Sequence, residues 1–507
     1  MTSAPTENLH RLPGGLRLPG FKAQSATGEI REVPIPATLI LPVRQHAGSA
    51  AQPIVAVGER VLRGQPIARA EGDFSASVHA SSSGTVVAIE SRPIPAREAV
   101  EAACIIIETD GQDQAWEGLA PIANPLAATP DALLEAIGGA GIVGLGGAVF
   151  PTLAKLRHAV DAGVDTLILN GVECEPYISC DDALMRNHAV EILFGTRIML
   201  TALGLRQCAI GIESDKPEAW AAFTEAASIE GDDRVQLVAI PTVYPSGGED
   251  QLVYLLTGRE VPSGGFPSDV GALVHNVGTA AAVADLALTG TPLISRIVTV
   301  TGEGIAKPGN YRVRLGTPIA DLAAFAGGYT EHAKRLIMGG PMTGVALTDD
   351  ALPVTKACNC LIATGPAVRT SFEPERPCIR CGECARICPV RLQPQQLLRA
   401  HRYGAGDTLD GLGLIDCIEC GCCDLVCPSH IPLTQSFRDA KLARRIDVYE
   451  RERAERARER FERRQEREQA RADAQAAETE RLKQGANPDA IAEILARKRG
   501  TPRGDDD

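Results

Sequence analysis

The chain has 507 residues, of which 44% are hydrophobic and 4% aromatic, and its formal net charge at pH 7 is −13. This length predicts about three or four domains. The negative charge argues against a nucleic acid as the main partner, because phosphate binding needs a basic surface. Its 15 cysteines, without a recognisable secretory signal, favour metal ligands in a reducing compartment. No apolar stretch offers the roughly 20 uncharged residues of a membrane span, so we expect a soluble or peripheral protein.

After an N-terminal segment, residues 1–30, the pattern over residues 31–115 predicts a barrel-sandwich domain. The stretch "IVAVGERVLRGQPIARAEGDFSASVHASSSGTVVAIE" has short strands separated by glycine turns, and it resembles biotin- and lipoyl-carrying domains. The hairpin "EGDFSASVHA" lacks the attachment lysine of those domains. A swinging arm is therefore not expected, and a structural or docking role is favoured.

Residues 125–290 contain three stretches that could hold a flavin or a nucleotide, and the first and third of them are glycine-rich. In "GIVGLGGAVFPTLAKL", residues 141–156, the glycines would let backbone N–H groups approach a phosphate or a flavin ring. A lysine follows one turn into the next helix. This stretch alone is weak evidence for a ligand site, because glycine loops are more often simple turns and the spacing is not G-x-G-x-x-G.

The second stretch, "DTLILNGVECEPYISCDD", predicts a short buried strand followed by polar residues. Asn170, Glu173 and Glu175 lie at the carboxyl end of that strand, where open α/β sheets bind ligands. An ordinary acidic loop is the alternative. The third stretch, residues 244–280, is again glycine-rich and contains Glu249 and Asn276.

A cysteine pattern occurs twice further along the chain, as "CIRCGECARICPV" at 378–390 and "CIECGCCDLVCPS" at 417–429. In C-x₂-C-x₂-C-x₃-C-P, three thiolates ligate one iron–sulfur cluster and the fourth ligates the other cluster. A pair of Cys₄ zinc sites is the alternative, but zinc sites use paired C-x₂₋₄-C halves. The predicted ligands are Cys378, Cys381, Cys384 and Cys427 for one [4Fe-4S] cluster, and Cys417, Cys420, Cys423 and Cys388 for the second.

The linker between the two motifs has a helical pattern in "LQPQQLLRAHRYG", which predicts a mostly helical dicluster domain over residues 366–440. Clusters carry single electrons, so a flavin is expected upstream to convert hydride pairs into single electrons. The remaining cysteines lack cluster spacing and are interpreted as a free thiol, Cys422, and as small buried hydrophobic residues, Cys104, Cys174, Cys180, Cys208, Cys358 and Cys360.

The C-terminal residues 441–507 are rich in Arg, Glu and Ala, with many opposite charges four residues apart, and this favours helix. Sustained apolar heptads are missing, so a coiled coil is not predicted. A solvated helix or disordered tail is favoured over a docking arm for a membrane partner, and "GTPRGDDD" is expected to be disordered.

The motifs "GLGGAVFPTLAK", "LNGVECEPY", "YPSGGEDQL" and "HNVGT", in this order and before two ferredoxin motifs, closely resemble the C subunit of the Rnf electron-transport complex. They are similar, more distantly, to the NADH- and FMN-binding subunit of respiratory complex I. The resemblance implies a multidomain α/β and α+β fold: a barrel-sandwich domain, a Rossmann-like flavin/NADH domain, a β-grasp (soluble-ligand-binding) module over 291–365 and a helical dicluster domain.

The resemblance also implies the residues that hold FMN and NADH. Val149, Val172 and Gly248 depart from the family pattern, and a β-branched residue at position 149 is expected to resist a positive φ and to narrow the approach to the flavin ring. The implied FMN contacts are Gly144, Gly146, Gly147, Lys155, Asn170, Glu173, Asn276 and Thr279. The implied contacts to the nicotinamide nucleotide are Phe150 by stacking, Glu175 and Glu249.

The function that the resemblance implies is electron transfer between NADH and ferredoxin, through FMN and two [4Fe-4S] clusters, coupled to ion translocation. The implied partners are integral membrane subunits and an iron–sulfur subunit, and the implied location is the cytoplasmic face of the bacterial inner membrane. A soluble NADH diaphorase module is one alternative. A non-catalytic iron–sulfur electron adapter with a decayed flavin site is the other.

Overall fold

The computed structural model describes residues 9–96, 100–230, 234–365, 374–485 and 487–499. The chain divides into two compact units, Met1–Phe437 and Arg438–Asp507. The first unit contains every strand that the structure describes and is built from four parts.

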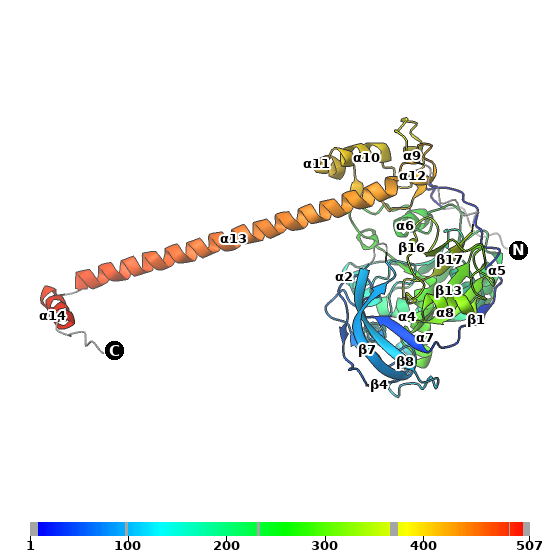
Figure 1. Cartoon of the computed structure of the whole chain (residues 1–507), viewed down its shortest axis with the longest axis horizontal. Coiled ribbons are helices and arrows are strands. Elements are labelled where there is room, and N and C mark those ends of the chain that lie inside the picture. Colours follow the sequence, from blue (N-terminus) through cyan, green and yellow to red (C-terminus); the bar gives the residue numbers. More distant parts are fainter. Residues whose placement is uncertain (1–8, 97–99, 231–233, 366–373, 486, 500–507) are drawn as a thin grey trace. The chain divides into compact units, whose positions relative to one another are not determined.

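The barrel-sandwich domain consists of two small antiparallel sheets with a shared core. Alternation along the strands decides which side chains point inward: Leu39 and Leu41 in one strand, and Ile105 and Ile107 in its partner, are fully buried. Figure 1 shows the long curved pair β7 and β8. One sheet has the order β2-β8-β7-β4 and the other β3-β5-β6, formed by β2 Thr38–Pro42, β3 Gln52–Pro53, β4 Arg60–Val61, β5 Pro66–Arg69, β6 Val78–His79, β7 Gly84–Ile94 and β8 Val100–Thr109.

The second part, which we call the parallel-sheet domain (residues 125–289), contains four parallel strands in the order β11-β10-β9-β12. Its strands are β9 Thr166–Gly171, β10 Cys208–Glu213, β11 Val235–Ile240 and β12 Ala272–Asn276. Its helices are η1 Pro125–Ala127, α1 Pro130–Gly139, α2 Thr152–Asp161, α3 Cys180–Asn187, α4 Ala189–Leu203, α5 Pro217–Glu230, α6 Glu249–Thr257, η2 Pro267–Val270 and α7 Val277–Thr289.

Both faces of the parallel sheet are buried, as the apolar run "TLIL" predicts. Leu167 and Leu169 belong to the large core that includes residues of α4 and α7. Ile168 points to the opposite face and packs in a smaller core with Leu252 and Val253 of α6. Helices on both faces leave the two edges and the strand ends as places for a ligand.

The third part, which we call the six-stranded module (residues 295–364), has the strand order β1-β14-β13-β17-β15-β16. Its first strand comes from the N-terminal segment, because Ile30–Glu32 pairs in parallel with β14. Its elements are β1 Ile30–Glu32, β13 Ser295–Thr301, β14 Gly309–Arg314, α8 Ile319–Phe325, β15 Arg335–Met338, β16 Val345–Leu347 and β17 Cys360–Thr364.

The fourth part, the cysteine domain (residues 374–437), is helical, as predicted. The short helices α9 and α12 (Figure 1) contact each other, and each lies within one copy of the cysteine motif. The helical pattern predicted between the two motifs is confirmed as α10. The elements are α9 Glu383–Arg386, α10 Pro394–Arg402, α11 Gly406–Gly411, η3 Leu414–Asp416 and α12 Cys422–Leu425.

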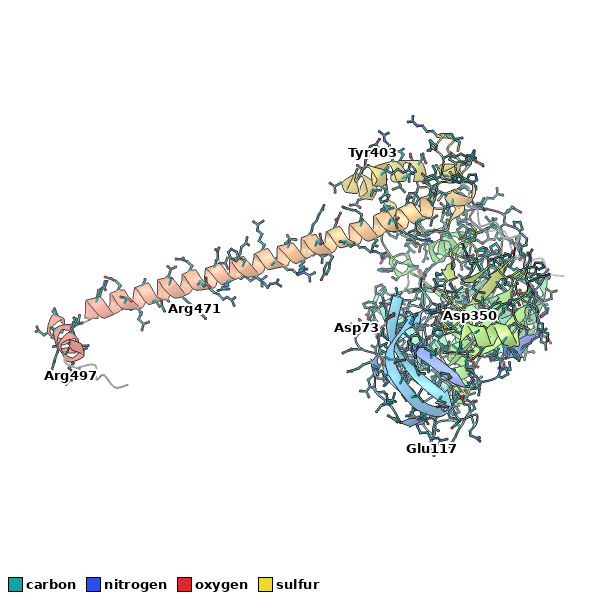
Figure 2. The ribbon with its side chains drawn as sticks, viewed as in Figure 1. Asp73, Glu117, Asp350, Tyr403, Arg471 and Arg497 are labelled. Atoms are coloured by element: carbon teal, nitrogen blue, oxygen red, sulfur yellow. The ribbon has the colours of Figure 1, made fainter. Side chains whose placement is uncertain are left out.

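The C-terminal region is helical: α13 spans Leu433–Gly485 and α14 spans Pro488–Arg499. Ion pairs four residues apart support α13, for example between Arg456 and Glu452 at 2.7 Å. Figure 2 shows side chains leaving α13 in all directions, Arg471 among them. Residues 500–507, expected to be disordered, lie outside the described residues. Among the helices that the structure describes, none has the length and apolarity to cross a bilayer.

Candidate functional site

The sheet order places a site between the carboxyl ends of β9 and β12. The chain runs from β9 to β10 and β11 on one side, and β12 lies on the other side of β9. In open α/β sheets such a reversal opens a crevice, here between the carboxyl ends of β9 and of the edge strand β12. Asn276 ends β12, Asn170 is the last residue but one of β9, and the two are partners in register. Both asparagines were predicted from the sequence as site residues.

The glycine loop, residues 143–151, is closed at its base and open at its tip. The N–H of Gly144 donates to the carbonyl of Phe150 at 2.8 Å, and Val143 forms a bridge with Pro151. The tip residues Gly146 and Gly147 are exposed, and no partner for their N–H groups is found within the described residues. These two N–H groups are therefore available to an anion or a flavin ring.

The glycine loop lies against the end of β12 and the start of α7. Thr279 of α7 accepts a hydrogen bond from the N–H of Leu145 at 3.0 Å. Asn276 caps α7 by accepting a hydrogen bond from the N–H of Gly278 at 2.8 Å, and a Cβ on Gly146 would lie 3.5 Å from the Asn276 side chain. Thr279 thus bonds the loop to α7, and Asn276 lies beside its tip.

Lys155 and Glu249 lie together at the rim of this crevice. The Lys155 Nζ donates to the Glu249 carboxylate at 2.5 Å and to the carbonyl of Val274 at 2.6 Å. Both side chains are partly exposed. Asp250, the next residue, has its pKa raised to about 6, mainly by burial and further by Glu249. Lys155, which was predicted to contact FMN, and Glu249, which was predicted to contact the nicotinamide nucleotide, therefore form one ion pair.

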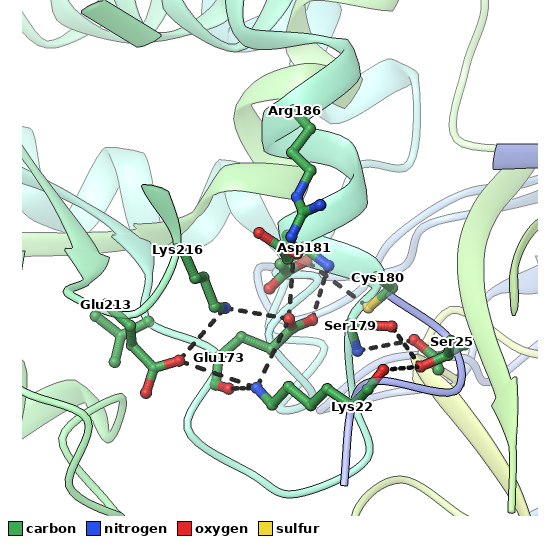
Figure 3. A network of polar contacts seen from close by, with 12 residues as sticks. Lys22, Ser25, Glu173, Ser179, Cys180, Asp181, Arg186, Glu213 and Lys216 are labelled. Atoms are coloured by element: carbon green, nitrogen blue, oxygen red, sulfur yellow. Dashed lines mark hydrogen bonds and ion pairs between the residues drawn. The ribbon is translucent and has the colours of Figure 1, made fainter. Parts of the chain in front are cut away.

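Glu173 is buried in a polar network rather than open to the crevice, as Figure 3 shows. Its carboxylate accepts hydrogen bonds from the N–H of Asp181 at 2.7 Å and from Lys216 at 3.2 Å. Lys22 donates to the Glu173 carbonyl. Burial opposes the charged form of Glu173, but Lys216 and Lys22 outweigh burial and hold its pKa below the ordinary value.

Asp181 links this network to the crevice. Its carboxylate accepts a hydrogen bond from the Asn276 side chain at 2.7 Å. Burial, and then the neighbouring charge of Glu173, raise the pKa of Asp181 to about 6. Glu173 therefore acts on Asn276 through Asp181, which is an indirect route to the site.

Glu175 points to a turn of the six-stranded module. Its carboxylate accepts hydrogen bonds from the N–H of Met342 at 3.1 Å, from the N–H of Thr343 at 3.0 Å and from the Thr343 hydroxyl. Burial raises its pKa, although these hydrogen bonds oppose the rise. A Cβ on Gly340 would overlap the carboxylate, so this turn needs glycine there.

The predicted residues therefore divide into two groups. The structure brings together, at the sheet edge, Gly144, Gly146, Gly147, Phe150, Lys155, Asn170, Glu249, Asn276 and Thr279. It directs Glu173 into the buried network and Glu175 onto the turn at 342–343.

The eight predicted cluster cysteines line two separate hollows. Each hollow takes three cysteines from one motif and the fourth from the other, which is the exchange that the spacing predicts. The first hollow, with about 390 Å³ between the atoms, is lined by Cys378, Cys381, Cys384 and Cys427. The second, with about 350 Å³, is lined by Cys388, Cys417, Cys420 and Cys423, together with the spare Cys422.

The second hollow adjoins the parallel-sheet domain. The Tyr244 hydroxyl donates to the carbonyl of Cys420 at 2.7 Å. A Cβ on Gly421 would lie 3.3 Å from the carbonyl of Met342, the residue whose N–H binds Glu175. Two thiols of the first hollow, Cys378 and Cys381, are exposed, whereas those of the second hollow are partly or fully buried.

Lys22, Lys216, Asp181 and Tyr244 take part in this arrangement and were not predicted from the sequence. Glu213 ends β10 and Lys216 follows three residues later, so the rule of carboxyl strand ends could have indicated both. Lys22 carries no such signal, because it is separated from Glu173 by 151 residues.

Comparison with known families finds a match for each part of the first unit. The family model described as "RnfC Barrel sandwich hybrid domain" matches residues 10–112, and the "Nuo51 FMN-binding domain" matches residues 137–285. The "SLBB domain" matches residues 297–346, and the "4Fe-4S dicluster domain" matches residues 377–432.

Curated relatives match over most of the chain, and all three of those described below are named as the C subunit of an ion-translocating oxidoreductase complex. The protein of Pseudomonas aeruginosa is 48% identical, over 93% of this chain and 60% of its own length. That of Yersinia enterocolitica is 43% identical, over 90% and 65%. That of Rhodobacter capsulatus is 44% identical, over 84% and 82%. The chain thus spans less than two thirds of the Pseudomonas relative and most of the Rhodobacter relative.

Proposed function

The chain belongs to the family of C subunits of ion-translocating oxidoreductase complexes, and from this premise we propose that it carries electrons between NADH and ferredoxin in a membrane-bound complex. In this proposal the electron flow is coupled to ion translocation. The main support for this proposal is that the glycine loop lies beside the point where the strand order of the parallel sheet reverses. A hollow lined by four predicted cluster thiols is hydrogen-bonded to the same domain through Tyr244.

FMN and [4Fe-4S] clusters are the cofactors of the matched domains. The residues present fit them. The exposed N–H groups of Gly146 and Gly147 suit a flavin or its phosphate, and each hollow offers four thiols in the dicluster pattern. When bound, FMN exchanges an electron pair with NADH and single electrons with the clusters.

For the flavin, the glycines of the loop and Asn170 are the proposed direct contacts, together with Lys155. Thr279 holds the loop, Asn276 lies beside its tip, and Glu173 acts through Asp181 on the Asn276 amide. Lys155 can bind a phosphate once its ion pair with Glu249 is shared or opened, since an ammonium has three donors.

For the nicotinamide nucleotide, Phe150, Glu175 and Glu249 are the proposed contacts. A carboxylate offers about four acceptor positions. Glu175 receives three hydrogen bonds from Met342 and Thr343, so it keeps capacity for a ribose hydroxyl. Phe150 is partly exposed at the base of the glycine loop and can stack on a planar ring.

Electrons from the flavin are proposed to enter the cluster in the second hollow, which is lined by Cys388, Cys417, Cys420 and Cys423. They are proposed to leave from the cluster in the first hollow, which includes Cys378. The Tyr244 contact to Cys420 and the exposure of Cys378 support this order. The proposed partners are integral membrane subunits, an iron–sulfur subunit and, through the complex, ferredoxin. The proposed place is the cytoplasmic side of the bacterial inner membrane.

The finer fold assignments belong to the same proposal. The parallel order β11-β10-β9-β12 supports a Rossmann-like flavin/NADH domain over 125–290. A β-grasp module over 291–365, the barrel sandwich over 31–115 and the dicluster domain over 366–440 complete the proposed division. A soluble diaphorase or a flavin-free adapter is not favoured, because the relatives are subunits of one complex and an FMN-binding domain is matched.

The test is an anaerobic NADH titration of protein reconstituted with FMN and clusters, followed by electron paramagnetic resonance. Wild type should give reduced cluster signals. Glu175→Ala should require at least about tenfold more NADH, because a nucleotide contact is lost. Glu225→Ala, an exposed residue of α5, serves as the matched control and should behave as wild type.

Two outcomes would count against the proposal at different levels. Equal reduction of wild type and Glu175→Ala would remove Glu175 from the nucleotide site. Wild-type protein that contains clusters but neither binds FMN nor responds to NADH would overturn the proposed function itself.

A further inference from the structure

The hairpin that lacks the carrier lysine has an aromatic residue at its tip. Residues 70–77 connect β5 to β6, and Phe74 in this hairpin is 57% exposed. Its ring lies edge-on to that of Phe150, with centroids 5.8 Å apart and an interplanar angle of 68°. Figure 2 labels the neighbouring residue Asp73 on the barrel-sandwich domain. A residue of one domain thus contacts the glycine loop of another.

The barrel-sandwich domain holds the Phe74 hairpin firmly. The N–H of Ser49 donates to the carbonyl of Phe74 at 2.9 Å. The buried His46 Nε2 lies 2.8 Å from the carbonyl of Ser49 and 3.0 Å from the N–H of Ala76. Gly48 has a φ of 100°, and a Cβ there would overlap the Phe74 carbonyl. The two adjoining loops therefore interlock, and the backbone position of Phe74 is fixed.

The same domain contacts the glycine loop next to Phe150. The N–H of Ala47 donates to the carbonyl of Val149 at 3.1 Å, directly before Phe150. Just before the loop, Lys356 of the six-stranded module bridges the two domains, because it donates to the carbonyls of Ser77 and Gly141 at 3.1 and 2.7 Å. These contacts tie the hairpin to the segment that carries the open N–H groups of Gly146 and Gly147.

We propose that Phe74 is a positioning residue of the nucleotide site: it holds the Phe150 ring edge-on, in the orientation that stacks on the planar ring of a nicotinamide dinucleotide. The inference rests on the proposed function. Edge-to-face pairs restrict a ring at little entropic cost, because each partner has only two rotatable side-chain bonds. The hairpin that presents a modified lysine in carrier domains presents a ring here.

The test compares Phe74→Ala, Phe74→Tyr and Phe266→Ala in the reconstituted full chain. Phe266 is a matched control, because it is 62% exposed in the same unit and contacts the ring of His158 instead. The readouts are the Kd for NADH and for redox-inert ADP-ribose, the FMN content, and KM and kcat for NADH oxidation with ferricyanide.

Phe74→Ala should weaken NADH binding and raise its KM by about fivefold or more, the size of an aromatic pair. Its FMN content, its kcat and its affinity for ADP-ribose should stay near wild type, because ADP-ribose lacks the nicotinamide ring. Phe74→Tyr should restore the NADH affinity, and Phe266→Ala should leave every readout unchanged.

Three results would overturn the inference. The first is an unchanged Kd for NADH in Phe74→Ala. The second is an equal loss for ADP-ribose. The third is a loss of FMN and of cooperative unfolding in both Phe74→Ala and Phe74→Tyr, which would make Phe74 purely structural. Wild-type protein that binds no NADH would instead contradict the proposed function, so the two failures are distinguishable.

Discussion

Val149 combines a β-branched side chain with a φ of 45°. A residue of this kind in the left-handed region costs about 1–2 kcal/mol, and glycine would avoid the cost. The sequence predicts that Val149 resists a positive φ, and the structure shows that Val149 adopts one in spite of this cost. The hydrogen bond from Ala47 to the Val149 carbonyl is one contact that holds the strained conformation.

Replacement of Val149 by glycine should increase the affinity for FMN by about threefold or more, because it removes the side chain that is expected to narrow the approach to the flavin ring. Fluorescence quenching of added FMN measures this on deflavinated protein. Val149→Ala keeps the Cβ in the left-handed region but removes both methyl groups, so it should fall between wild type and Val149→Gly. Affinity that stays constant through the series would contradict the interpretation.

Individual residues were predictable where the chain itself carries the signal. Asn170 and Asn276 follow apolar strands, so their place at a sheet edge could be inferred from the pattern. Lys22, a partner of Glu173, could not be inferred in this way, because it is 151 residues away and lies in the N-terminal segment, outside any predicted strand. Such long-range ion pairs depend on packing, which local sequence does not encode.

At the scale of elements, the cysteine domain repeats one backbone turn. Arg380 and Glu419 have φ values of 59° and 54°, and Gly382 and Gly421 follow with 80° and 76°. Each turn leads into a four-residue helix, α9 or α12. Equal spacing of the cysteines thus corresponds to equal backbone geometry, which is why the sequence predicted this domain so closely.

The exchange of ligands between the two motifs can be tested with paired substitutions. Cys378→Ser combined with Cys427→Ser should remove roughly half of the iron and acid-labile sulfide, because both residues line the first hollow. Cys417→Ser combined with Cys427→Ser should remove nearly all of it, because each cluster then lacks a ligand.

Cys422→Ser is the control and should retain both clusters, since Cys422 lies outside the predicted spacing although it lines the second hollow. The reverse order, with nearly all of the iron lost from the Cys378/Cys427 variant and about half from the Cys417/Cys427 variant, would mean that each motif binds its own cluster. Substantial zinc in oxygen-free preparations of wild type would contradict iron–sulfur ligation altogether.

At the scale of the first unit, Lys356 joins three of its parts. It belongs to the six-stranded module, and its ammonium donates to Gly141 of the parallel-sheet domain and to Ser77 of the barrel sandwich. The side chain is 1% exposed, and burial lowers its pKa from 10.5 to about 7. Two carbonyls offset only part of the cost of burying this charge.

The free energy of unfolding should therefore depend on pH through Lys356. Between about pH 7 and 10.5 the unfolded chain binds more protons than the folded chain, so stability rises with pH. Relative to Lys356→Met, wild type should gain up to several kcal/mol over this range, at about 1.4 kcal/mol per pKa unit. Denaturant unfolding at several pH values measures the difference.

Lys334→Met, at an exposed lysine of the same module, should show no such trend. A pH-independent difference between wild type and Lys356→Met would mean that Lys356 titrates as it does in the unfolded chain. Neither Lys356 nor Phe74 stood out in the sequence, because both act between domains, and composition and periodicity describe the domains one at a time.

The register of β9 against β12 has a consequence for the evolution of this chain. Asn170 meets Asn276 only while both strands keep their present lengths, because Leu169 pairs with His275 one position earlier. A single-residue insertion or deletion in either strand would bring an unlike side chain to the crevice and turn the apolar residues beyond it to the wrong face. Length variation between homologues should therefore be found in the connecting loops, while these two strands stay fixed in length.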